Sequence, residues 1–273
     1  MAGDAHAAGA AGGQVDIIGH IVDHDYLELP FIDPHHMLAG KLELPQFELF
    51  GIDMSITRHV AVMWLAGLLL FILLKAAFSG KRGRLANFFE TLVVFIRDEV
   101  VLPNMGEAGR PFMPFFLTIF FFILFCNLLG LFPYSATATG NVNVTAGLAL
   151  CTFVVTQGTG IVKNGLFGFL RSFAPSGVPW PVLLILVPIE IVSAFIKPFA
   201  LTVRLFANMV AGHVVILVFL GLIVMLGHVA VAAISIPLAT AIYVFEIFIA
   251  FVQAFIFTLL SAIFIGMAAH PDH

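Results

Sequence analysis

Several ionisable side chains stand inside the most apolar part of the chain, towards its C-terminal end. Lys197 and Arg204 are seven residues apart, which places them on one stripe of a helix, and Asn208 follows one turn later on the same face. Glu190 falls close to that stripe, whereas His213 falls on the opposite face of a straight helix. A charge at the centre of a bilayer costs about 2.5–3.5 kcal/mol, so ionisable residues in such places usually mark a path for ions.

A second polar stripe lies in the last apolar segment. Glu246 and Gln253 are also seven residues apart, and we expect the two stripes to face each other across a hydrated gap. Small residues share the second stripe and let helices approach closely. They are Ala250, Ala254 and Ser261.

These residue types suit the transfer of protons. Arginine stays protonated, so Arg204 can hold an opposite charge but cannot relay a proton. Histidine titrates near neutral pH and a buried carboxylate can do the same, so His213 and Glu246 both suit relay roles. The alternative interpretation is that Glu190–Lys197 and Glu246–His213 are ion pairs that only lock the helices together.

The composition places most of the chain in a membrane. Of its 273 residues, 61% are hydrophobic and 10% are charged, against roughly 45–50% and about 25% in soluble domains. Only six of the 161 residues between Arg110 and Asp272 carry a charge, so no water-facing surface can be built from them. A net charge of −4 without a large basic cluster argues against a nucleic-acid partner.

We predict no metal site and no cofactor. Both cysteines lie in apolar runs, away from any zinc-ligand spacing. The histidines of the N-terminal part are interpreted as solvated. They are His20, His24, His35 and His36.

The apolar segments predict an all-α integral membrane protein. We expect membrane-embedded helices at about 57–78, 111–132, 144–168, 181–227 and 236–269, and an amphipathic surface helix at 84–104. A helix over 181–227 would be about 70 Å long at ~1.5 Å per residue, while the hydrocarbon layer is ~30 Å thick. This segment must break, at Pro188 or Pro198, or lie strongly tilted; we expect the last two helices to be long and strongly tilted.

Two regions and one orientation follow from the charges. Residues 1–56 form an acidic, polar extension, and residues 57–273 form the membrane domain. Lys and Arg flank the loops after the first and third predicted spans, while the loop at 133–143 and the region near 226–236 have none. The positive-inside rule then puts the N-terminus outside and the C-terminus in the cytoplasm.

Several sequence runs resemble one family. KPFALTVRLFANMVAGH at 197–213, FVQAFIFTLLSAIF at 251–264, NLLGLFP at 127–133 and NVNVT at 141–145 are similar to subunit a of bacterial F-type ATP synthases. The resemblance covers about residues 55–270. It implies a multi-pass stator subunit of the bacterial inner membrane, not an enzyme by itself. It would stand beside a ring of c subunits and join b-type peripheral stalk subunits and other ATP synthase subunits.

The resemblance also implies roles for individual residues. Arg204 takes the place of the family's arginine, which is thought to face the ring carboxylate and to block a direct proton leak between two aqueous half-channels. Asn208 and Gln253 correspond to positions that line one half-channel. Glu190 and Ser193 correspond to polar positions on the other.

The sequence departs from the best-known bacterial pattern at one pair of positions. In that pattern a carboxylate stands nine residues after the arginine and a histidine stands seven residues before the glutamine. Here His213 and Glu246 occupy those places in reverse. The exchange preserves a proton-carrying couple.

Two other function classes remain open. A self-contained secondary transporter with a midplane ion site would be expected to show inverted repeats, and none is evident. A structural scaffold would not need five ionisable groups in its core. The chain has no nucleotide-binding motif, so chemistry on ATP is expected from partner subunits. A His/Glu couple favours H⁺ over Na⁺ as the transported ion.

Overall fold

The computed structural model describes residues 57–79, 83–132, 137–173 and 179–269, together with the backbone of four short strands near the N-terminus. Antiparallel pairs are formed by β1 (Tyr26–Leu29) with β2 (Gly40–Glu43), and by β3 (Glu48–Leu49) with β4 (Ile52–Asp53). The histidines interpreted as solvated, at positions 20, 24, 35 and 36, lie outside the described residues.

Helices make up the regular structure of the described residues from 57 onwards, which confirms the predicted all-α membrane class. Five helical segments in these ranges are long and apolar enough to cross a membrane. They are α2 (Arg58–Phe78), the stretch Arg84–Gly130 that ends in α5 (Met113–Gly130), α6 (Val142–Ser172), α7 (Trp180–Leu226) and α8 (Val229–Ala269).

The predicted surface helix at 84–104 is built from three pieces. An α-helix, α3 (Arg84–Phe95), passes into a π-helical turn, η1 (Ile96–Val101), and then into α4 (Leu102–Met105). A 3₁₀ segment, η2 (Gly106–Phe112), leads on to α5. Charged side chains along this stretch are exposed, and two pairs of them are in contact: Nε of Arg97 lies 2.7 Å from Oδ1 of Asp98, and Nε of Arg110 lies 2.6 Å from Oε2 of Glu107.

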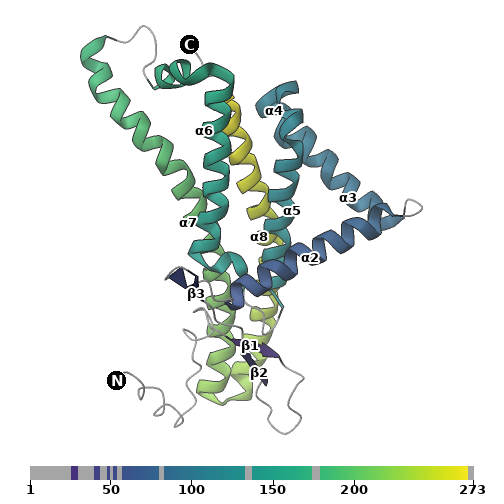
Figure 1. Cartoon of the computed structure of the whole chain (residues 1–273). Helices are drawn as coiled ribbons and strands as arrows, with labels where there is room; N and C mark the ends of the chain where they lie inside the picture. Colours follow the sequence, from purple (N-terminus) through teal and green to yellow (C-terminus); the bar gives the residue numbers. More distant parts are fainter. Residues whose placement is uncertain are drawn as a thin grey trace.

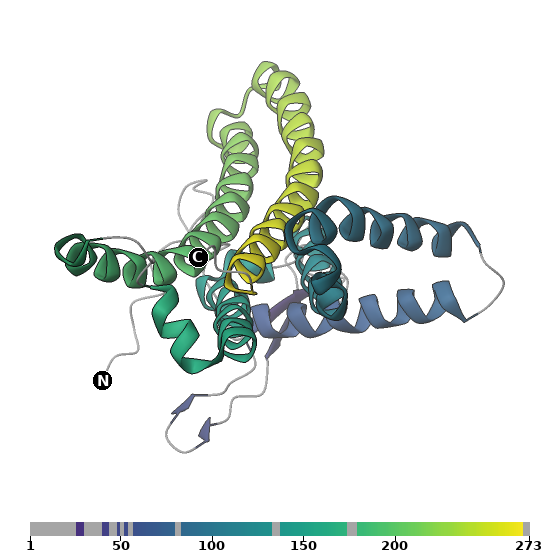
Figure 2. The same cartoon turned by 90° about the horizontal axis from the view of Figure 1, so that it is seen from above.

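The two longest helices are α7 and α8. Neither Pro188 nor Pro198 breaks α7, which is continuous over 47 residues; of the two alternatives for this segment the break is excluded, and the helix is long, as expected. Figure 2 shows that α7 changes direction along its length, and a proline inside a helix is the ordinary cause of such a bend. The last helix begins at Val229 rather than near Ile236. The apolar run before Pro237 extends it, because membrane helices tolerate proline in their interior.

The core lies where α5, α6 and α7 pack against α8. Large side chains of α5, such as Phe116 and Phe120, are fully buried there. They meet a surface of small α8 residues, and Ala250, Ala254 and Ser261 are completely buried, as their spacing predicts. In Figure 1, α2 and α3 form a hairpin that projects away from these helices. Close helix approach through small residues therefore holds the bundle together.

The ends of α7 and α8 lie at two opposite ends of the molecule (Figure 1). One end carries the last residues of α6 and α8 and the start of α7. The other carries the turn between α7 and α8, with the N-terminal strands on the same side (Figure 1). A short 3₁₀ turn, η3 (Ala138–Gly140), stands between α5 and α6 and also contacts α7. The first residues of α7 therefore lie near one end of the molecule, and its last residues lie near the other.

Candidate functional site

A buried ion-pair geometry joins α7 to α8. Nδ1 of His213 lies 3.1 Å from Oε1 of Glu246. Glu246 is 2% exposed, while 28% of the His213 side chain is exposed. The pair predicted from the sequence is thus formed, and it connects a buried carboxylate to a partly accessible imidazole.

The other neighbours of His213 determine where its protons can sit. Nε2 lies 2.9 Å from the carbonyl oxygen of Gly130 and 3.0 Å from the hydroxyl of Thr137. Nδ1 also lies 3.2 Å from the carbonyl oxygen of Met209. Carbonyl oxygens only accept hydrogen bonds, so the surroundings accommodate a proton on either ring nitrogen. The imidazole can therefore hold one proton or two and share one with Glu246.

A glycine makes room for the carboxylate. A methyl group built on Gly212 would overlap Oε1 of Glu246, so the glycine lets α8 bring this side chain against α7. The second oxygen, Oε2, is buried without a hydrogen-bond partner among the described residues. This oxygen is the free end of the couple and can pass a proton onwards.

A second polar network lies beside the couple. Asn127 on α5 is fully buried; its Nδ2 donates to the carbonyl oxygen of Ala250 at 3.3 Å, and its Oδ1 accepts from the hydroxyl of Thr139 at 2.6 Å. Gln253, three residues beyond Ala250, is also buried. The predicted polar stripe of α8 is therefore lined by α5 and η3.

Arg204 does not face this cluster. Its side chain is exposed, and it makes no hydrogen bond or ion pair with any other residue that the structure describes. The expectation that its stripe faces the Glu246 stripe is wrong. Leu201 and Leu205 are buried in the core. Because a helix turns about 100° per residue, Arg204 points away from the core. Asn208, one turn further, is half-buried.

The surface around Arg204 is apolar. Phe199 and Val203, close to Arg204 in sequence, are both exposed. A permanent cation on such a surface is costly in a membrane unless an opposite charge meets it. The acid that Arg204 requires is not supplied by the described part of this chain.

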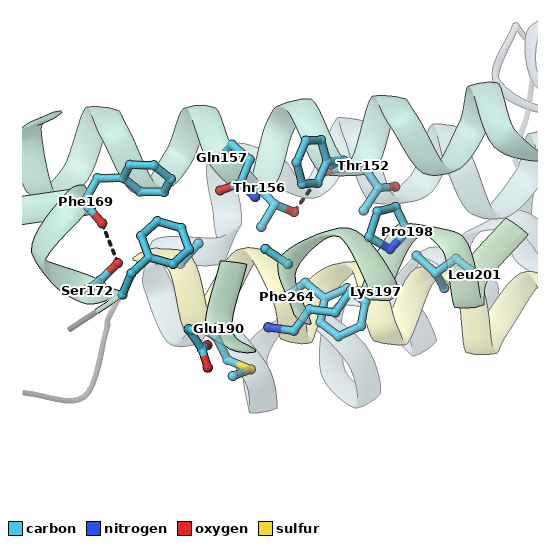
Figure 3. Close-up of a pocket in the computed structure, with 15 residues that line it drawn as sticks. Thr152, Thr156, Gln157, Phe169, Ser172, Glu190, Lys197, Pro198, Leu201 and Phe264 are labelled. Carbon is cyan, nitrogen blue, oxygen red and sulfur yellow. Dashed lines mark hydrogen bonds between the residues drawn. The ribbon is translucent and has the colours of Figure 1, made fainter. Parts of the chain in front are cut away.

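The N-terminal half of α7 borders a cavity of about 320 Å³ between α6, α7 and α8. Glu190 and Lys197 reach it from α7, and Thr156 and Gln157 reach it from α6 (Figure 3). Nζ of Lys197 lies over the ring of Phe264, 5.5 Å from its centroid. No ion pair joins Glu190 to Lys197 among the described residues, so the structural-pair interpretation fails for them. Ser193 is half-buried and does not line the cavity.

Five residues of these two polar networks were not predicted from the sequence. They are Asn127, Gly130, Thr137, Thr139 and Gly212. The run NLLGLFP contains the first two, but nothing in its spacing shows that it meets α7 and α8. Thr137 and Thr139 stand in a connection whose path depends on tertiary packing.

Comparisons with known proteins bear on the whole chain. The family described as ATP synthase A chain matches residues 60–266. An ATP synthase subunit a from Chloroherpeton thalassium is 49% identical over 95% of this chain and 78% of its own length. One from Myxococcus xanthus is 52% identical over 81% and 77%. One from Anaeromyxobacter dehalogenans is 47% identical over 97% and 75%. With its apolar helices and these matches, the chain belongs to the ATP synthase subunit a family, multi-pass subunits of the membrane sector of F-type ATP synthases.

Proposed function

We propose that this chain forms two aqueous half-channels that carry protons to and from carboxylates on a ring of c subunits, so that proton flow drives ring rotation and ATP synthesis. The observation that carries the proposal is the exposed Arg204 on the apolar face of α7, without an acidic partner in the described chain. A carboxylate presented by a neighbouring subunit would complete it.

The two candidate half-channels lie on either side of Arg204 along α7. His213 is nine residues beyond it, about 14 Å along the helix axis, and Glu190 is fourteen residues before it, about 21 Å away. In Figure 1 these directions lead to opposite ends of the molecule. One path uses His213, Glu246, Asn208 and Gln253. The other uses Glu190 and Ser193.

Arg204 separates the two paths. An arginine cannot give up its proton, so it blocks direct proton passage while holding the ring carboxylate ionised. Protons would then cross only by riding the ring from one half-channel to the other. A self-contained transporter is disfavoured, because its ion site would need a counter-charge to Arg204 within the chain. The chain itself catalyses no reaction on ATP.

The remaining parts of the proposal concern placement. The N-terminus lies outside and the C-terminus in the cytoplasm of a bacterial inner membrane, since basic residues follow alternate loops. The projecting α2–α3 hairpin leaves apolar surface for lipid and for b-type peripheral stalk subunits.

Disulfide formation tests the ring contact directly. A cysteine at Ala207, exposed beside Arg204, should cross-link to a cysteine introduced next to the ring carboxylate in assembled membranes. A cysteine at Leu205, which is buried, is the matched control and should not cross-link. Equal yields at both positions, or no product at Ala207, would contradict the proposed face.

A further inference from the structure

A threonine outside the predicted site contacts the relay histidine. Thr137 precedes η3 and is 7% exposed. Its hydroxyl lies 3.0 Å from Nε2 of His213. The same nitrogen lies 2.9 Å from the Gly130 carbonyl oxygen. Nε2 thus has two neighbours of different chemistry, a hydroxyl that can donate or accept and a carbonyl that only accepts.

These two neighbours serve the two protonation states of Nε2. When Nε2 carries no proton, the Thr137 hydroxyl can donate to it while the proton on Nδ1 faces Glu246. When Nε2 is protonated, it can donate to the Gly130 carbonyl oxygen. Both states are therefore hydrogen-bonded, which matters where an unsatisfied polar group is costly.

Two contacts hold Thr137 in this place. Nδ1 of His59, at the start of α2, lies 3.0 Å from the carbonyl oxygen of Thr137, and His59 is 5% exposed. Since that oxygen can only accept, Nδ1 of His59 carries the hydrogen. On the other side, a methyl group built on Gly130 would overlap the Thr137 side chain. The fold thus fixes Thr137 from α2 and from α5.

We propose that the Thr137 hydroxyl delivers protons to Nε2 of His213, and that His59 is the residue that positions Thr137. The hydroxyl gives its hydrogen to Nε2 and takes another from a protonated water (H₃O⁺) of the half-channel, so that the threonine is regenerated, a neutral water remains and the imidazole has gained one proton. The reverse sequence returns a proton to water. This inference rests on the proposed function, because it assigns the group preceding His213 in one half-channel.

The test is ATP-driven proton pumping by the whole complex in inverted membrane vesicles, with assembly measured for every variant. Thr137→Val keeps the shape but removes the hydroxyl, and should reduce pumping by about fivefold or more. Thr137→Ser keeps the hydroxyl and should restore most of the rate. The matched control is Thr145→Val, since among the described residues the Thr145 hydroxyl bonds only to backbone carbonyls at the start of its own helix.

His59 provides a second, independent pair of variants. The side-chain nitrogen of asparagine can replace Nδ1, so His59→Asn should pump well, whereas His59→Leu should lose rate as Thr137→Val does. If Thr137→Val fails to assemble, the comparison of His59→Asn with His59→Leu still tests the role of Thr137. The inference is overturned if assembled Thr137→Val pumps at the parental rate, if Thr137→Ser is as impaired as Thr137→Val, or if His59→Leu equals His59→Asn.

An Arg204→Ala complex, measured in the same vesicles, distinguishes a failure of the Thr137 inference from a failure of the proposed function. If Arg204→Ala abolishes pumping while Thr137→Val does not affect it, only the role of Thr137 is wrong. If Arg204→Ala also pumps normally, the proposed function itself is wrong.

Discussion

Nδ1 of His213 and Oε1 of Glu246 are 3.1 Å apart, although 33 residues separate them in the chain. The connection runs through the rest of α7, the turn at Gly227 and His228, and the first half of α8. Only the packing of two long antiparallel helices can bring them together. Because each group is the other's hydrogen-bond partner, they should behave as a unit when either one is changed.

Exchanging His213 and Glu246 tests whether the two residues act as a unit. Each single change, His213→Glu or Glu246→His, should remove most proton pumping, because it creates two carboxylates or two imidazoles side by side. A carboxylate at 213 would also face the carbonyl oxygens of Gly130 and Met209, which cannot donate to it. The double exchange restores one group of each kind and should recover part of the rate, measured in inverted vesicles with assembly checked. A double variant no better than the worse single variant would mean that the residues act independently.

Gly212 should tolerate no side chain. Gly212→Ala would push the Glu246 carboxylate away from His213, so pumping should fall by about tenfold or more. Gly147→Ala is the control, since nothing lies within 4 Å of a methyl group at that position. That change should leave the rate intact and stabilise its helix by about 0.5–1 kcal/mol. Equal rates for the two variants would show that the close approach is unimportant.

Glu190 and Lys197 should differ although they line the same cavity. Glu190→Gln removes the proton-binding carboxylate and should slow pumping by about threefold or more. Lys197→Met keeps the apolar stem over Phe264 and should pump close to the parental rate. If Lys197→Met is the more damaging change, the second path has been assigned to the wrong residue.

The orientation can be tested with labelled cysteines. Ser79 and Asn143 are both exposed and lie at successive connections. In a chain with Cys126 and Cys151 replaced by alanine, Ser79→Cys should react with an impermeant thiol reagent only from the cytoplasmic side, and Asn143→Cys only from the opposite side. Labelling of both from one side would overturn the topology.

The helices were predictable because the membrane imposes a simple pattern. The span at 57–78 corresponds to α2 within one residue of its start, since an apolar run bounded by Arg58 and Lys75 leaves little choice. The expected start of the last helix, near Ile236, was wrong: α8 begins at Val229 and contains Pro237, and membrane helices tolerate proline in their interior.

The candidate site was predictable only where helical spacing determines the faces. The positions of His213 and Glu246 followed from the spacing together with the family resemblance. The outward direction of Arg204 did not follow from the spacing, because it depends on which face of α7 packs against α8; only the resemblance, which sets this arginine opposite a ring carboxylate, implied it. Thr137 lies in the connection between α5 and α6, and His59 lies at the start of α2. The spacing of residues in the sequence gives no information about a contact of this kind.

Arg204→Ala provides the most direct test of a proton path divided by one arginine. ATP synthesis and ATP-driven proton pumping are measured in vesicles in which the variant complex assembles to the parental level. Both activities should be abolished, because nothing then holds the ring carboxylate ionised between the half-channels. Arg204→Lys should not restore them fully, since an ammonium lacks the permanently charged, delocalised fork. ATP synthesis at the parental rate by Arg204→Ala would contradict the proposed role of this chain.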